Sequence, residues 1–245
     1  MFCDTHCHLL SEYYPDIEDI LKVSKEEGVS RVINAGYNYP SSLEVLGLVK
    51  KYPDMYGVVG LHPENIDEEF DYKIFDNLDR KIVGIGEIGL DYHYTKENRL
   101  KQIEVFERQL DIAEKLGLPV VIHSRDAVMD TLEVLKRHHN FGVIHSFSGS
   151  LEVAREYIKL GFVLGINGVV TFKNCNLKDT LKNIDMNSIV LETDSPYLTP
   201  VPFRGTQNNP GKMMNTAKFV ADIYGVSLSE LAEITNQNIK RIFDI

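Results

Sequence analysis

Short apolar runs rich in β-branched residues alternate with longer amphipathic stretches along the whole chain. Several of the runs are continuously apolar, which is typical of parallel strands buried on both faces. Eight of them are candidate strands, at residues 2–6, 31–36, 56–60, 81–87, 118–123, 141–145, 162–167 and 188–193. This pattern predicts strands that alternate with helices, the order of a parallel α/β sheet.

The stretches between these runs have the spacing of amphipathic helices. Residues 96–116 place apolar side chains near one stripe, and Gly117 is a typical stop signal. Two segments, Ser41 to Glu44 and Ser227 to Glu230, have the Ser-x-x-Glu pattern of a capping box and predict helix starts. Eight strand–helix units in one chain predict a (β/α)8 TIM barrel that forms a single domain over residues 1–245. The alternative is a doubly wound open sheet, but that fold more often has a Gly-rich phosphate loop after its first strand.

The chain is acidic, with 26 Lys and Arg residues against 36 Asp and Glu residues and a net charge of −10. Proteins that coat nucleic acid rely on basic patches, so the composition argues against that class. It does not argue against an enzyme that meets phosphate groups through bound cations, because such ions reverse the local field.

Cysteine usage and hydropathy bear on location. The three cysteines include no CxxC pair, which indicates a reducing compartment and no disulfide framework. No apolar run reaches the ~18 residues of a membrane span, and no basic region followed by an apolar one opens the chain. We therefore expect a cytoplasmic protein without a membrane segment, a secretory leader or an obligate protein partner.

Histidines follow the predicted strands. In DTHCH (4–8), His6 and His8 alternate with Cys7, so a strand would point both imidazoles and Asp4 to one face. Other polar residues at or just after strand ends are His62, Glu87, His123, His145 and Asp194. The carboxyl ends of barrel strands form one catalytic face, so these distant residues are predicted to converge.

Four imidazoles and two carboxylates form the predicted ligand set: His6, His8, Glu87, His123, His145 and Asp194. A single catalytic zinc takes about three protein ligands, so six suit two divalent ions about 3.5–4 Å apart with one bridging carboxylate. Mixed nitrogen and oxygen ligation fits Zn, Mn, Ni or Co, and Mg less well.

Motifs in order along nearly the whole chain carry a family resemblance. They are DTHCH (4–8), GLHPE (60–64), GEIGLDY (86–92), VIHSRDA (121–127), HSFSGS (145–150), LETDSPYLTP (191–200) and PVPFRG (200–205). With these motifs, the chain resembles the TatD-type metal-dependent deoxyribonucleases of the amidohydrolase superfamily. The resemblance implies one ion on His6, His8 and Asp194, a second on His123 and His145, and Glu87 as the bridge. The sequence departs from the family pattern at Glu64, where a histidine is usual, and at Asn209, where an acid is usual.

Residues near the ligands suggest further roles. Asp194 is a candidate to accept the proton of the attacking water. His62 is predicted to contact the scissile phosphate or its leaving oxygen instead of a metal. Arg125 and Arg204 are candidate phosphate clamps, because guanidinium binds phosphate oxygens in a bidentate way. Asp4 and Glu192 are candidates to orient neighbouring histidines, with simple structural pairing as the alternative.

The predicted function is a metal-dependent phosphodiesterase that hydrolyses DNA, with hydroxide held between the ions attacking phosphorus in line. The resemblance implies a 3′-to-5′ exonuclease acting on single strands, and frayed ends are the other expected substrate. One alternative is a metal-dependent esterase or amidase, including one that deacylates aminoacyl-tRNA. Amidase relatives commonly use a carboxylated lysine after the fourth strand, where this chain has Glu87. The remaining alternative is a barrel that serves only as a binding scaffold.

Overall fold

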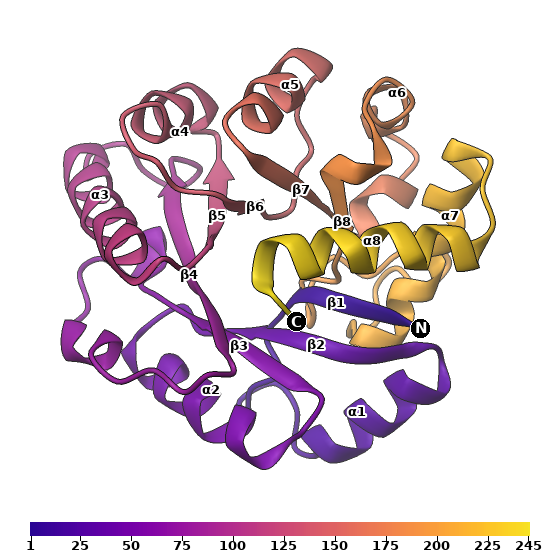
Figure 1. Cartoon of the computed structure of the whole chain (residues 1–245), viewed down its shortest axis with the longest axis horizontal. Coiled ribbons are helices and arrows are strands. Elements are labelled where there is room, and N and C mark those ends of the chain that lie inside the picture. Colours follow the sequence, from indigo (N-terminus) through magenta and orange to yellow (C-terminus); the bar gives the residue numbers. More distant parts are fainter.

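The computed structural model describes residues 1–245 and confirms the barrel. Its eight strands pair in parallel in chain order, each with the next. Figure 1 shows most of the helices outside the ring of strands. The strands are β1 (Phe2–Cys7), β2 (Val29–Ala35), β3 (Met55–Val59), β4 (Ile82–Asp91), β5 (Val120–Arg125), β6 (Gly142–Ile144), β7 (Phe162–Ile166) and β8 (Ile189–Leu191).

Helices follow every strand except β3. The link from β3 to β4 contains only two 3₁₀ turns, η1 (Pro63–Asn65) and η2 (Tyr72–Phe75). Three more 3₁₀ turns are η3 (Gly168–Thr171), η4 (Met186–Ser188) and η5 (Pro210–Lys212). The α-helices are α1 (Ile17–Glu26), α2 (Tyr39–Lys51), α3 (Arg99–Leu116), α4 (Val128–Leu135), α5 (Leu151–Lys159), α6 (Leu177–Leu181), α7 (Met213–Tyr224) and α8 (Leu228–Phe243). None of the helices combines the length and the apolar character needed to cross a membrane.

The helix ends test the capping predictions. Gly117 ends α3 in the left-handed conformation, and the Ser227 side chain accepts the Glu230 N–H at the start of α8, both as predicted. The start predicted at Ser41 is wrong. Asn38 caps α2 and forms the capping box with Ser41, so Ser41 is the third helical residue. Asn is as good a cap as Ser, and Pro40 fits the first turn, which moves the start three residues back.

Two apolar clusters form the core. The larger one, of 48 buried residues, lies mainly between the strands and the surrounding helices. The smaller one has 12 residues and combines strand side chains such as Val58 and Val121 with Ile239, Ile242 and Phe243 of α8. Figure 1 shows α8 crossing the barrel, with the C-terminus near the centre of the view. The last turn of α8 therefore closes one end of the barrel interior.

The barrel closes between β8 and β1 without a regular ladder; one isolated bridge joins Cys7 and Ser195. Beyond the bridge, the Asp194 N–H donates to the His6 carbonyl at 2.9 Å, and the Thr193 N–H donates to the buried Asp4 carboxylate at 3.0 Å. The pairing of β1 with β2 shifts register between Asp4 and Cys7. Strict alternation along β1 is therefore wrong, and Cys3 and Cys7 lie in different apolar clusters.

Candidate active site

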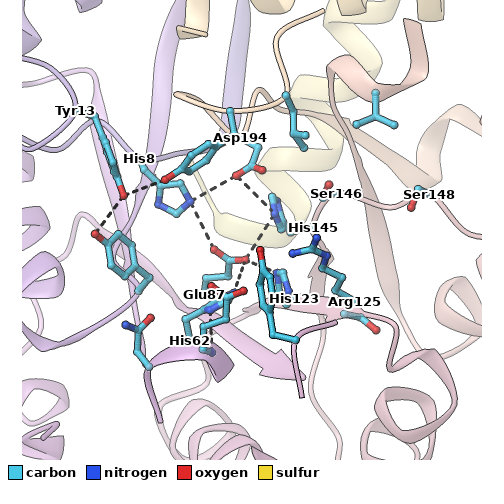
Figure 2. Close-up of a pocket in the computed structure, with 18 residues that line it drawn as sticks. His8, Tyr13, His62, Glu87, His123, Arg125, His145, Ser146, Ser148 and Asp194 are labelled. Carbon is cyan, nitrogen blue, oxygen red and sulfur yellow. Dashed lines mark hydrogen bonds and ion pairs between the residues drawn. The ribbon is translucent and has the colours of Figure 1, made fainter. Parts of the chain in front are cut away.

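The predicted ligands converge at the carboxyl ends of the strands. His6 and His123 lie within β1 and β5, Glu87 lies within β4, and the other three follow β1, β6 and β8. A cavity of about 720 Å³ opens at this end of the barrel. Figure 2 shows five of the six side chains lining it: His8, Glu87, His123, His145 and Asp194. His6 is fully buried beside them, and its ring stacks on that of His145 with centroids 3.7 Å apart.

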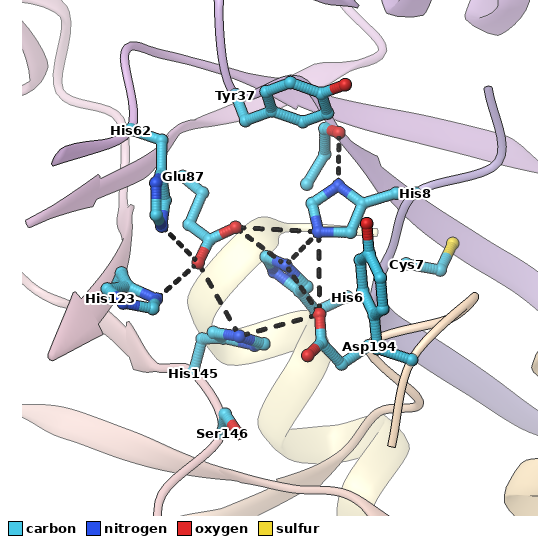
Figure 3. Close-up of polar contacts among 12 residues, drawn as sticks. His6, Cys7, His8, Tyr37, His62, Glu87, His123, His145, Ser146 and Asp194 are labelled. Carbon is cyan, nitrogen blue, oxygen red and sulfur yellow. Dashed lines mark hydrogen bonds and ion pairs between the residues drawn. The ribbon is translucent and has the colours of Figure 1, made fainter. Parts of the chain in front are cut away.

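The Glu87 carboxylate lies at the centre of the cluster, as Figure 3 shows. Its Oε2 atom is 3.3 Å from Nε2 of His6 and 3.6 Å from Nε2 of His8. Its Oε1 atom is 2.8 Å from Nδ1 of His123, 3.5 Å from Nε2 of His62 and 3.6 Å from Nε2 of His145. Burial alone would raise the pKa of Glu87, but the surrounding histidines outweigh it and hold the pKa well below its usual range. The two oxygens thus face two different groups of imidazoles.

Asp194 completes one of these groups. Its Oδ1 atom lies 3.5 Å from Nε2 of His8, 3.8 Å from Nε2 of His145 and 3.9 Å from Nε2 of His6. The residue has φ +54°, in the left-handed region that Asp tolerates better than most residues. Burial raises the pKa of Asp194, but His145 and His8 lower it by more, so the carboxylate stays ionised.

These residues fit divalent cations. Nε2 of His6 and Nε2 of His8 lie 3.4 Å apart, which is about the separation of two nitrogens bound at 2.0–2.1 Å to one tetrahedral ion. Nδ1 of His8 bonds the Ala35 carbonyl at 2.9 Å, so its Nε2 lone pair faces the cluster. Potential ligand atoms of three groups approach within 4.8 Å of one another: His6, His8 and Glu87; His6, His145 and Asp194; and His62, Glu87 and His123.

His123 and His145 each lie between carboxylates that favour a positive charge on the ring. Burial lowers the pKa of His123, but Asp91 and Glu87 outweigh it and raise the pKa to about 9. At His145 burial is likewise outweighed, mainly by Glu192 and Glu87, and the pKa rises to about 10. A neutral imidazole has one N–H, so a ring between two carboxylates needs either a second proton or a metal cation.

Glu192 supports His145, as the sequence suggested. The carboxylate is fully buried, its Oε1 lies 3.0 Å from Nδ1 of His145, and it accepts the Ser146 N–H at 2.7 Å. Gly165 on β7 makes room for it, because a Cβ atom there would lie 2.2 Å from Oε2 of Glu192. A side chain at position 165 would therefore displace the carboxylate that orients His145.

Asp91 is a functional candidate that sequence reasoning missed. Its buried carboxylate lies 2.8 Å from Nε2 of His123 and accepts the His93 N–H at 2.8 Å. An Nε2–H held by Asp91 leaves the Nδ1 lone pair of His123 facing Glu87, which is how outer carboxylates orient metal-binding histidines. The signal was present, since positions 87, 89 and 91 share one face of a strand, but the predicted strand ended at 87 whereas β4 continues to Asp91.

His62 has a fixed tautomer that separates it from the other histidines. Its Nδ1 accepts the Glu64 N–H at 3.2 Å, so in the neutral ring the proton is on Nε2, which points at Glu87. Nε2 then has no lone pair for a metal and is a hydrogen-bond donor in the cavity. Contact of His62 with substrate stays a prediction.

The remaining candidates lie in different places. Arg125 lines the cavity, with Nη1 4.0 Å from the Asp91 carboxylate. Arg204 is not among the lining residues, and its guanidinium lies 3.7 Å from the centre of the Phe172 ring. Asp4 accepts the backbone N–H of His6 at 3.2 Å and bonds no imidazole ring, so its contacts are those of barrel closure.

The chain is similar in sequence and in fold to known proteins. The family model described as TatD related DNase matches residues 3–244. The uncharacterized metal-dependent hydrolase YabD of Bacillus subtilis is 37% identical over 100% of both chains. The uncharacterized metal-dependent hydrolase YcfH of Escherichia coli K12 is 34% identical over 99% of this chain and 95% of its own. The crystal structure of YjjV, a TatD homologue from Escherichia coli K12, covers 100% of this chain and 98% of its own with a TM-score of 0.94 and 29% identity.

Proposed function

The chain belongs to the family of TatD-related DNases, and we propose that it is a phosphodiesterase that hydrolyses DNA from 3′ ends of single strands or frayed duplexes. Family membership and relatives named metal-dependent hydrolases support the coarser statement, a metal-dependent hydrolase. The observation that supports the phosphodiesterase is the Glu87 carboxylate, whose two oxygens face separate imidazole groups.

Each group has the donors for one divalent ion. His6, His8 and Asp194 would hold the first ion and His123 and His145 the second, with Glu87 shared between them. Zn, Mn, Ni and Co suit this mixture of nitrogen and oxygen donors, and Mg suits it less. When bound, such a pair supplies Lewis-acid stabilisation of phosphate oxygens and lowers the pKa of water.

The protein residues perform the remaining steps. The ionised Asp194 is placed to accept a proton from the attacking water. His62 donates its Nε2–H to an oxygen of the scissile phosphate, and Arg125 provides a bidentate clamp at the cavity rim. Arg204 is a second candidate clamp for the strand outside the cavity.

The test uses metal-stripped protein and single-stranded DNA labelled at its 3′ or its 5′ end. Mg, Mn, Zn or no metal is then added, and Glu87→Gln is compared with Glu26→Gln, which changes an exposed glutamate on α1. Metal-restored laddering from the 3′ end, lost in Glu87→Gln and kept in Glu26→Gln, is the expected result. Two bound ions with no DNA cleavage under any metal would overturn the nuclease assignment and point to ester or amide substrates.

A further inference from the structure

Three tyrosines from three separate loops line one side of the cavity. Tyr13 follows β1, Tyr37 follows β2 and Tyr197 follows β8, and we call them the tyrosine wall. The ring of Tyr37 meets that of His8 edge-on, with centroids 5.7 Å apart. The wall therefore lies directly beside the proposed site of the first ion, and Figure 2 shows Tyr13 next to His8.

The hydroxyl groups of the wall bond to one another. Tyr197 donates to the Tyr13 oxygen at 3.1 Å, and the Tyr13 and Tyr37 oxygens lie 3.4 Å apart. Tyr37 donates to the Glu12 carboxylate. Since an ionised carboxylate only accepts, the protons run in one direction from Tyr197 to Glu12. Burial and Glu12 raise the pKa of Tyr37 to about 12, which keeps its hydroxyl protonated.

The row of hydroxyl bonds uses all three phenolic protons of the tyrosine wall within the protein and leaves the ring surfaces for a ligand. The Tyr197 side chain is 50% exposed, and its ring meets that of Tyr13 at 72° with centroids 5.9 Å apart. The two rings form a corner that offers a face and an edge to a flat aromatic group. Because the hydroxyl bonds already hold the rings, little side-chain entropy is lost on binding.

The opposite side of the cavity has a different chemistry. Ser124, Arg125, Ser146 and Ser148 line it, and Figure 2 shows the last three across the cavity from Tyr13. A guanidinium and hydroxyl groups suit phosphate oxygens. A ligand that spans the cavity thus has an anionic part and a flat aromatic part on opposite sides of the metal cluster, as a nucleotide unit has.

We propose that the tyrosine wall is a binding subsite for one unpaired nucleobase of the substrate strand, next to the scissile phosphate. The proposal rests on the phosphodiesterase function and extends it. Stacking on tyrosine needs an exposed base face and tolerates all four bases, so the subsite selects single strands or frayed ends over duplex without selecting sequence.

The test compares Tyr197→Ala with Tyr197→Phe, which keeps the ring, and with Phe141→Ala, which removes another partly exposed aromatic next to β6 at the opposite end of the barrel. The probes are a single-stranded oligonucleotide and a matched one whose three terminal residues at each end are abasic. Both kcat/KM and binding, by fluorescence anisotropy, are measured, with bound metal as a third readout.

Base stacking on an aromatic side chain is worth about 1–3 kcal/mol, so Tyr197→Ala is expected to lower kcat/KM and binding about 5- to 150-fold on the normal strand. Both should change less than twofold on the abasic strand, with metal content unchanged. Tyr197→Phe keeps the ring but loses its hydroxyl bond to Tyr13, so it should lose less than Tyr197→Ala, and Phe141→Ala should behave like wild type. Equal losses on both strands, or no loss on either, would overturn the subsite.

The binding measurement distinguishes a failure of the subsite from a failure of the proposed nuclease function. Protein that cleaves neither strand but loses base-dependent binding on Tyr197→Ala would support the subsite and refute the nuclease. Cleavage without any difference between the two strands would refute the subsite alone. If neither cleavage nor base-dependent binding occurs, both proposals fail.

Discussion

Replacing Asp91 by asparagine tests whether the outer carboxylate controls one half of the proposed metal site. The substitution keeps the shape of the side chain but leaves one oxygen, which can accept from Nε2–H of His123 or from the His93 N–H and not from both. With that oxygen on His123, the bond to the imidazole remains and loses its charge. A hydrogen bond to a charged group contributes about 1.5–3 kcal/mol and a neutral one about 0.5–1.5 kcal/mol. The difference, about 1–1.5 kcal/mol, corresponds to about tenfold weaker binding of the ion. This is the lower end of the 10- to 100-fold loss of metal affinity usual when a residue that orients a ligand is changed.

The assay is competition with a chromophoric chelator, which resolves two binding constants, together with metal counting after dialysis. We expect the ion on the His123 side to weaken about 10- to 100-fold, while the ion on the His6 and His8 side changes less than twofold. Asp126→Asn is the matched control, because Asp126 pairs with exposed His93 at 3.0 Å outside the cluster. Equal weakening of both ions, or none, would refute the positioning role of Asp91.

Three other outcomes follow from contacts in the structure. Gly165→Ala brings a Cβ atom to 2.2 Å from Glu192 and should lower the free energy of unfolding by about 1–3 kcal/mol. Gly47→Ala in α2, where a Cβ atom meets open space, should raise the free energy of unfolding by about 0.5–1 kcal/mol, and thermal unfolding measures both changes. The hydrogen bond from Arg99 lowers the pKa of Asp130. The contribution of the Asp130 carboxylate to stability is therefore present above its ordinary pKa of 3.8 and is lost as pH falls through the lower pKa of the folded state. In Asp130→Asn, the free energy of unfolding from urea melts should depend less on pH in that acid range only, and an unchanged profile would contradict this. Chelation should lower Tm in step with the logarithm of the free metal concentration, because ions held by residues of five strands would stabilise only the folded barrel; a Tm insensitive to chelator would argue against tight sites.

Local patterns account for the successes of the sequence analysis. Strand and helix periodicities depend on neighbouring residues only, so the eight strands and the barrel could be predicted, although the link after β3 has two 3₁₀ turns where a helix was expected. The carboxyl ends of parallel barrel strands share one face whatever the loops do, which is why Glu87 and Asp194 could be placed together without coordinates. The same reasoning failed where a local signal had competitors, as at Asn38 and Ser41, which both suit a helix cap.

Side-chain identities and spacings determined the ligand types, the acidic balance and the order of the strands, because these are properties of the chain read along its length. Tertiary structure decided what depends on distance between segments. The 2.8 Å contact of Asp91 with His123, the tautomer of His62 and the joined hydroxyls of Tyr13, Tyr37 and Tyr197 are of this kind. The position of Arg204, over Phe172 and outside the cavity lining, is another example. Loop geometry sets such positions through many weak contacts that no short stretch of sequence contains, so they emerge only when the barrel is closed.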